Sequence, residues 1–206
     1  MSSSNYYKFL FSRFYDPFMH SIEMKELTHR RERLLSPLDG TILEIGSGTG
    51  INLPFYSTNT KVFALEPNPH MWEIIEKKRH YTCNLEPIVK GIEDPEVQMR
   101  FTEPFFDSVV CTLVLCNVPD LRNTFRFIEK VLKVGGKLVL LEHIRSHSNF
   151  SAGIQDFFSP SWKFFADGCN LNRETDKVVK EFDFKLEWEE YFSISLPFYS
   201  AIYEKQ

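Results

Sequence analysis

The sequence predicts an α/β fold in which a mostly parallel sheet carries helices on both faces, a doubly wound architecture. Apolar strand-like runs alternate with helical patterns at least four times along the chain. These runs are continuously apolar, as is typical of parallel strands that are buried on both faces. The length of 206 residues suits one domain with a sizeable core, and the hydrophobic fraction of 43% excludes a disordered chain. We therefore expect a single domain over residues 1–206.

The N-terminal half of the chain begins with a helix predicted over residues 21–35, where apolar residues recur at helical spacing between charges. Pro37 ends this helix. A strand over 61–66 is closed by the break Pro67-Asn68-Pro69. The further segments expected here are a strand over 41–45, a short segment over 51–56, a helix over 70–79 and a short strand over 86–89.

The C-terminal half continues the alternation with a strongly apolar strand predicted over 106–115. A helix over 120–133 follows, and we expect Gly135-Gly136 to stop it. Beyond Arg145 the sequence becomes rich in Phe and Ser, and residues 146–174 are expected to form an insert on the substrate side. The remaining elements are a strand over 137–141, a helix over 173–182 and a closing pair of strands over 186–192 and 198–203.

Charge and cysteine usage exclude several classes of protein. The net charge of -4 gives no reason to expect a nucleic-acid partner, and the basic patch at 30–33 is interpreted as the solvated face of a helix. The four cysteines lack a C-x-x-C spacing, which excludes a zinc ribbon and a thioredoxin motif and indicates reduced thiols. Without an apolar span of about 20 residues or a signal peptide, the chain is expected to be cytoplasmic. Its N-terminal aromatic residues either form a lid or core contact or rest on a bilayer surface as a peripheral contact.

Three glycines follow the strand over 41–45 at intervals of two: Gly46, Gly48 and Gly50. Glycine adopts positive φ without penalty and lets the backbone approach a ligand closely, so this is either a cofactor loop or an ordinary turn. Glu66 ends the next strand, where a carboxylate can accept hydrogen bonds from ribose hydroxyls. In parallel sheets ligands bind beyond the carboxyl ends of the strands, so we expect the segments after each strand to converge there.

The motif Glu-x-Gly-x-Gly-x-Gly that starts at Glu44 resembles the first motif of class I S-adenosylmethionine-dependent methyltransferases. Residues 91–93, 106–110 and 132–138 are similar to later motifs of that family, with Val134 where a proline is usual. The resemblance implies a Rossmann-like, seven-stranded sheet with a C-terminal antiparallel strand and an N-terminal helical lid over 1–36.

The resemblance also implies S-adenosylmethionine as cofactor and S-adenosylhomocysteine as product. The loop would face the methionine group, Glu66 the ribose, and Thr112 and Leu113 would present backbone to the methionine group. Met71 either packs on adenine or is a plain core residue. The implied cofactor-binding residues are Tyr15, Glu44, Gly46, Ser47, Gly48, Gly50, Asn52, Glu66, Pro67, Met71, Gly91, Ile92, Glu93, Thr112 and Leu113.

A narrower resemblance rests on residues 111–116, 141–143 and 167–174, which are similar to the microsomal thiol S-methyltransferases, the methyltransferase-like proteins seven. Members of that family carry an N-terminal hydrophobic anchor, which we expect this chain to lack. The resemblance implies methylation of a small, rather apolar thiol. Two alternatives stay open: C- or O-methylation of a quinone, lipid or phenolic compound, and a sensor or scaffold that binds the cofactor without catalysis.

Residues of the acceptor side follow the last parallel strand. His143 is the candidate base or orienting group, with a structural histidine as the alternative. Asp167, Cys169 and Asn170 are candidates for acceptor contacts or for structural caps. Cys111 and Cys116 are interpreted as small buried hydrophobes rather than nucleophiles. A sulfonium is already an activated leaving group, so no metal is required.

Overall fold

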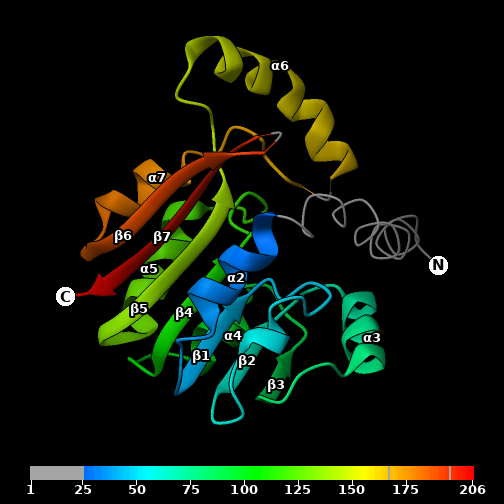
Figure 1. Ribbon diagram of the computed structural model, residues 1–206, viewed down its shortest axis with the longest axis vertical. Coiled ribbons are helices and arrows are strands. Elements are labelled where there is room, and N and C mark those ends of the chain that lie inside the picture. Colours follow the sequence, from blue (N-terminus) through cyan, green and yellow to red (C-terminus); the bar gives the residue numbers. More distant parts are fainter. Residues whose placement is uncertain (1–25, 167, 195) are drawn as a thin grey trace. The chain divides into compact units, whose positions relative to one another are not determined.

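The computed structural model describes residues 26–166, 168–194 and 196–206 (Figure 1). The chain forms two compact units, which divide between residues 91 and 92. We describe each unit by itself, and the expectation of a single domain stays a prediction. Within the described ranges, no helix combines the length and the hydropathy that crossing a bilayer requires.

The first unit contains three parallel strands in the order β3-β2-β1. In their registers, Thr41 lies opposite Lys61, and Lys61 lies opposite Asn84. The last four residues of β1 and of β2 are buried, as the continuous apolar runs predict. The elements of this unit are α2 (Thr28–Leu35), β1 (Thr41–Ile45), η2 (Leu53–Phe55), β2 (Lys61–Leu65), α3 (Pro69–Lys78) and β3 (Asn84–Ile88).

The second unit contains the strands β4, β5, β7 and β6, in that order. β4 and β5 are parallel, and β7 is antiparallel to both β5 and β6. The elements are α4 (Pro95–Arg100), β4 (Phe106–Thr112), α5 (Leu121–Val131), β5 (Leu132–His143), α6 (Asn149–Phe165), α7 (Thr175–Val178), η3 (Val179–Glu181), β6 (Phe184–Ser193) and β7 (Pro197–Lys205). The prediction of a seven-stranded, mostly parallel sheet with a C-terminal antiparallel strand is confirmed.

The junction between α5 and β5 corrects one prediction. The helix ends at Val131, and Gly135 and Gly136 lie inside β5 instead of stopping the helix. Their role is to absorb an irregularity in the register between β4 and β5. Gly135 has a φ of +73°, and a Cβ on Gly136 would lie 2.7 Å from the carbonyl oxygen of Lys133. Glycine is therefore required here to let the chain pass from helix to strand.

The strand predicted over 106–115 is also shorter than expected. β4 ends at Thr112, because Leu113 has a φ of +54° and its backbone leaves the strand. The helix predicted over 173–182 is confined to the short α7 and the 3-10 turn η3. The first change lengthens the irregular segment that follows β4.

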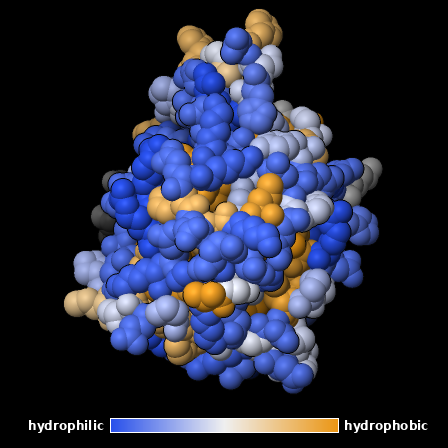
Figure 2. All heavy atoms as spheres, turned by 90° about the vertical axis from the view of Figure 1, so that its left-hand side faces the viewer, coloured by the Kyte–Doolittle hydropathy of each residue, from blue (hydrophilic) through white to orange (hydrophobic). Residues whose placement is uncertain are grey.

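The insert contains one long helix, α6, whose faces are inverted relative to an ordinary surface helix. Its buried face carries Ala152, Gln155 and Ser159, whereas Phe150 and Phe157 are 79% and 77% exposed. Figure 2 shows hydrophobic side chains on the surface at the top of the view, the end at which Figure 1 places α6. The helix is held to its unit by hydrogen bonds: Gln155 Nε2 donates to the carbonyl oxygens of Ile144 and Leu171, both at 3.1 Å.

Candidate active site

The glycine loop follows β1 as predicted. Gly46, Gly48 and Gly50 have φ values of +68°, +54° and +78°, the left-handed region that favours glycine. A Cβ on Gly50 would lie 3.0 Å from side-chain carbons of Leu53 and Ile75, whereas a Cβ on Gly48 would meet no atom within 4 Å. The loop therefore needs glycine for its conformation, and at Gly48 it leaves open space for a ligand.

A buried polar chain lies beside this loop. Glu44 is 1% exposed and accepts hydrogen bonds from Tyr56 Oη at 2.8 Å and Asn52 Nδ2 at 3.1 Å. Arg31 Nη1 donates to Asn52 Oδ1 at 2.6 Å. Burial raises the pKa of Glu44 to about 7, against the two hydrogen bonds and the charge of Arg31. Glu44 and Asn52, two predicted cofactor residues, bond to each other and brace the loop from both ends.

Arg31 also corrects the interpretation of the basic patch at 30–33. The side chain is only 2% exposed and belongs to the buried chain of Asn52 and Glu44, so the patch is not simply a solvated helix face. An arginine run alone does not say which member points inward. The helical spacing of Arg31 with Leu34 and Leu35, which are also buried on α2, was the signal that could have found it.

Glu66 joins the glycine loop to the start of α3. Its Oε2 accepts a hydrogen bond from the Gly48 amide at 3.0 Å, and its Oε1 accepts one from the Asn68 amide at 2.8 Å. The Trp72 indole donates to the carbonyl oxygen of Glu66 at 2.9 Å. A carboxylate has about four lone-pair sites, so these bonds are compatible with the predicted contacts to ribose hydroxyls.

The other predicted cofactor residues fall into both units. Met71 is 4% exposed on α3, and Pro67 is exposed. In the second unit, Ile92 and Glu93 line a cavity of about 400 Å³. Tyr15, like Asp167 of the acceptor side, lies outside the described residues.

The segment after β4 is held by the carboxylate of Glu142, a strand-end residue to which the sequence analysis gave no role of its own. Glu142 is fully buried, and its Oε1 accepts hydrogen bonds from the amides of Val114 and Leu115, both at 3.0 Å. The Leu113 amide donates to the carbonyl oxygen of Leu141 at 2.9 Å. Burial raises the pKa of Glu142 to about 7. Its position directly before His143 at a strand end was the available signal.

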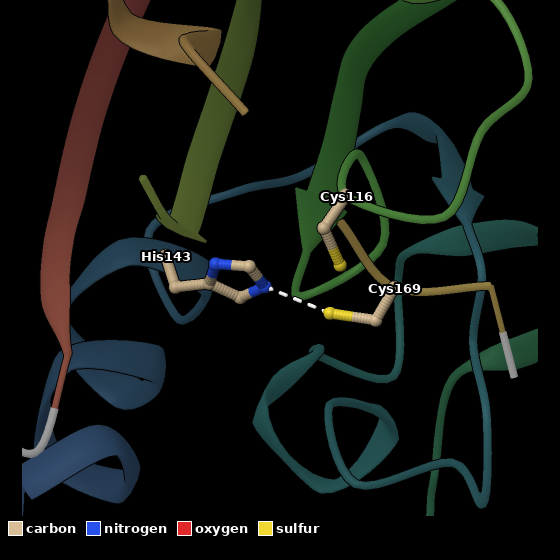
Figure 3. A group of neighbouring side chains, drawn as sticks. All are labelled: Cys116, His143 and Cys169. Atoms are coloured by element: carbon tan, nitrogen blue, oxygen red, sulfur yellow. Dashed lines mark hydrogen bonds between the residues drawn. The ribbon is translucent and has the colours of Figure 1, made fainter. Parts of the chain in front are cut away.

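Cys116, His143 and Cys169 form a cluster, which we call the sulfur–imidazole cluster (Figure 3). Cys116 lies in the loop after β4, His143 ends β5, and Cys169 follows α6. His143 Nε2 lies 3.2 Å from Cys169 Sγ, and the Sγ atoms and a ring nitrogen of His143 all lie within 4.8 Å of one another. The structure thus brings together two residues that the sequence predicted for the acceptor side and one that it interpreted as a buried hydrophobe.

Asn170 and Arg173 hold the two cysteine loops together. The side-chain amide of Asn170 donates to the carbonyl oxygen of Cys116 at 2.8 Å, and its backbone amide donates to the same oxygen at 3.1 Å. Arg173 Nε donates to it at 3.4 Å, and a second nitrogen of the guanidinium donates to the carbonyl oxygen of Val118. Asn170, predicted as an acceptor contact, thus ties the loop of Cys169 to that of Cys116.

The cluster shifts the pKa values of its two thiols in opposite directions. The hydrogen bond from Cys116 lowers the pKa of Cys169 most, burial opposes it, and His143 and Trp162 lower the pKa further, to about 5. The hydrogen bond to Cys169 and burial raise the pKa of Cys116 well above its ordinary value. Burial lowers the pKa of His143, but Cys169 and Glu142 outweigh it, and the net direction is upward. Cys169 and His143 thus favour a thiolate beside an imidazolium.

Comparisons with known proteins identify the family of the chain. Residues 18–186 match the family described as "Methyltransferase domain". The chain is 35% identical over 153 residues to the thiol S-methyltransferase TMT1B of Rattus norvegicus, a match that covers 72% of this chain and 63% of the relative. It is 31% identical over 169 residues to the Homo sapiens TMT1B, covering 78% and 69%. The chain thus spans just under two thirds of the rat protein's length.

Solved structures share the fold. A SAM-dependent methyltransferase from Methanosarcina mazei superposes with a TM-score of 0.62 at 17% identity, covering 88% of this chain and 98% of that one. The geranyl diphosphate C-methyltransferase of Streptomyces coelicolor, in complex with S-adenosyl-L-homocysteine, has a TM-score of 0.61 at 12% identity, covering 87% and 78%. At these identities the likeness concerns the fold alone.

Proposed function

Because this chain belongs to the methyltransferase domain family and is an S-adenosylmethionine-dependent enzyme, we propose that it methylates the sulfur of a small, rather apolar thiol. When bound, the cofactor supplies a methyl group on a sulfonium and leaves as S-adenosylhomocysteine once the acceptor sulfur has taken the methyl. The protein's task is to bind, align and exclude water, since the leaving group is already activated.

The residues of the first unit fit this cofactor. Gly48 leaves open space where a side chain would stand, and Ser47 Oγ is buried with no hydrogen-bond partner among the described residues. A buried hydroxyl without a partner is costly, so a polar ligand group beside the loop would satisfy it. The carboxylate of Glu66, already oriented by Gly48 and Asn68, would accept the ribose hydroxyls.

The single observation that carries the thiol assignment is the sulfur–imidazole cluster. His143 Nε2 and Cys169 Sγ lie 3.2 Å apart where β5 ends, the edge at which parallel sheets bind their ligands. Sulfur and imidazole are soft, polarisable groups. They therefore suit an acceptor sulfur better than they suit the harder oxygen of a phenolate. The relatives are named for thiol S-methylation, which supports the same assignment.

In this proposal the imidazolium of His143, which the thiolate of Cys169 beside it keeps charged, holds the acceptor's sulfur as a thiolate. A thiol has an ordinary pKa of about 8.5, so a neighbouring N–H donor is enough to favour the ionised form at neutral pH. The proton leaves to solvent before the sulfur lone pair forms the new bond to the methyl carbon. His143 is then an orienting donor to sulfur, one of the two roles predicted for it.

The test supplies methyl-labelled S-adenosylmethionine with an alkyl thiol, a phenol and a quinone that carry the same alkyl group. We expect label in the thioether and little in the other two products. Cys169→Ala should lower thiol turnover at least ~10-fold, while calorimetry shows unchanged cofactor affinity. Cys83→Ala, a buried thiol of the first unit, is the matched control and should keep full turnover. Label only on oxygen or carbon would contradict thiol methylation and would favour C- or O-methylation of a quinone or phenolic compound.

A further inference from the structure

We infer that Cys116, His143 and Cys169 form a binding site for a soft divalent cation of the zinc class. Their potential ligand atoms lie within 4.8 Å of one another and come from three different segments of the second unit (Figure 3). Two thiolates and one imidazole are a donor set that zinc and its close relatives prefer over calcium or magnesium.

The separation of His143 and Cys169 requires little adjustment. With Zn–S bonds of about 2.3 Å and Zn–N bonds of about 2.0 Å, tetrahedral ligand atoms lie about 3.5 to 3.8 Å apart. The observed separation of His143 Nε2 and Cys169 Sγ is 3.2 Å. The sulfur and nitrogen therefore have to move apart by only a few tenths of an ångström to admit an ion between them.

The three side chains are held in place by groups outside the cluster. Glu142 fixes the amides of Val114 and Leu115, and Asn170 fixes the carbonyl oxygen of Cys116 through two hydrogen bonds. His143 is 7% exposed at the end of β5, so the strand limits its motion. Such outer contacts are what metal sites use to orient their ligands.

Charge compensation favours a divalent ion. A divalent ion with two thiolates and a neutral imidazole has no net charge. In that state His143 coordinates through Nε2 and carries its proton on Nδ1.

Three protein ligands leave one tetrahedral position open, the arrangement of catalytic rather than structural zinc sites. We assign this position to the sulfur of the acceptor thiol, which would replace a water molecule and release one proton to solvent. This assignment rests on the acceptor class of the proposed function, and in it the ion replaces the His143 N–H as the group that stabilises the thiolate. Binding of the ion itself does not rest on that function.

The test titrates Co²⁺ into the reduced full chain after chelator treatment. We expect one ion per chain, a thiolate-to-cobalt charge-transfer band and a higher thermal midpoint with Zn²⁺. Cys169→Ser and His143→Gln should each lower Co²⁺ affinity at least ~100-fold, and Cys83→Ser should not change it. Retained cofactor affinity in each variant shows that it has folded. Absence of the band, or a band that persists in Cys169→Ser, would overturn the site. So would equal Co²⁺ uptake by the reduced protein and by air-oxidised protein in which Cys116 and Cys169 form a disulfide.

Adding an alkyl thiol to the Co²⁺ protein tests the open position. An intensified charge-transfer band is expected, because a third sulfur joins the ion, and an unchanged band would exclude the acceptor from it. The two proposals fail in different ways. If metal-free protein methylates thiols and takes up no Co²⁺, only the metal site is contradicted. If the protein takes up Co²⁺ but transfers no methyl group to any thiol, only the proposed function is contradicted.

Discussion

Glu66 Oε2 and the Gly48 amide are joined by a hydrogen bond of 3.0 Å, which fastens the end of β2 to the glycine loop. The same carboxylate accepts a hydrogen bond from the amide of Asn68, the residue directly before α3. Glu66 therefore has two tasks that one substitution affects together: it shapes the loop, and it is the predicted partner of the ribose hydroxyls.

Glu66→Ala should weaken cofactor binding. Loss of charge-assisted hydrogen bonds costs about 1.5 to 3 kcal/mol, which corresponds to a roughly 10- to 100-fold higher Kd in calorimetry. Glu76→Gln, an exposed acid on α3, is the matched control and should leave the Kd within ~2-fold. An unchanged Kd for Glu66→Ala would remove this residue from the cofactor site.

Gly48→Ala should destabilise the chain and weaken cofactor binding. A Cβ would meet no atom within 4 Å, so the cost comes from the φ of +54° alone, about 1 to 2 kcal/mol. Gly153→Ala is the matched comparison, since a Cβ there also meets nothing, but the residue lies inside α6. Alanine should stabilise that helix by about 0.5 to 1 kcal/mol. Urea unfolding measures both, and equal effects of the two substitutions would contradict the conformational argument.

Glu44 should make the stability fall as the pH rises. Below about pH 4.5 the carboxyl is protonated in both the folded and the unfolded chain. Between the ordinary pKa of 4.5 and the folded pKa of about 7, the unfolded chain loses the proton first, so the free energy of unfolding decreases. The total is on the order of 3 kcal/mol. The thermal midpoint of Glu44→Gln minus that of the parent should therefore increase across this window, and a constant difference would show that Glu44 does not titrate there.

The two faces of α6 should respond unequally to substitution, with a large effect on the buried polar face and a small one on the exposed apolar face. Gln155→Leu removes buried hydrogen bonds to Ile144, Ser146 and Leu171 and should cost about 1 to 3 kcal/mol in urea unfolding. Phe157→Ser changes a side chain that is 77% exposed and should alter stability by less than about 0.5 kcal/mol. A large loss for Phe157→Ser would mean that the exposed face is covered in solution.

Much of the fold of this protein could be predicted from local sequence patterns. Continuous apolar runs predicted β1 and β2, and the spacing of Gly46, Gly48 and Gly50 predicted a loop that needs positive φ. These features depend on a few neighbouring residues, whose burial and backbone preferences are visible in the order of amino acids. The family and the cofactor follow from the resemblance of the same motifs to those of class I methyltransferases, and the glycines are needed there because the backbone itself meets the ligand.

Tertiary structure alone decided which side chains meet. Cys116, His143 and Cys169 lie far apart in the sequence, and the pairing of β4 with β5 together with the contacts of Asn170 brings them into one cluster. No local pattern distinguishes Cys116 from an ordinary buried cysteine, since its neighbours are contributed by other segments. The same reason applies to Arg31, which charge assigns to the surface and which the polar partner Asn52 draws into the interior.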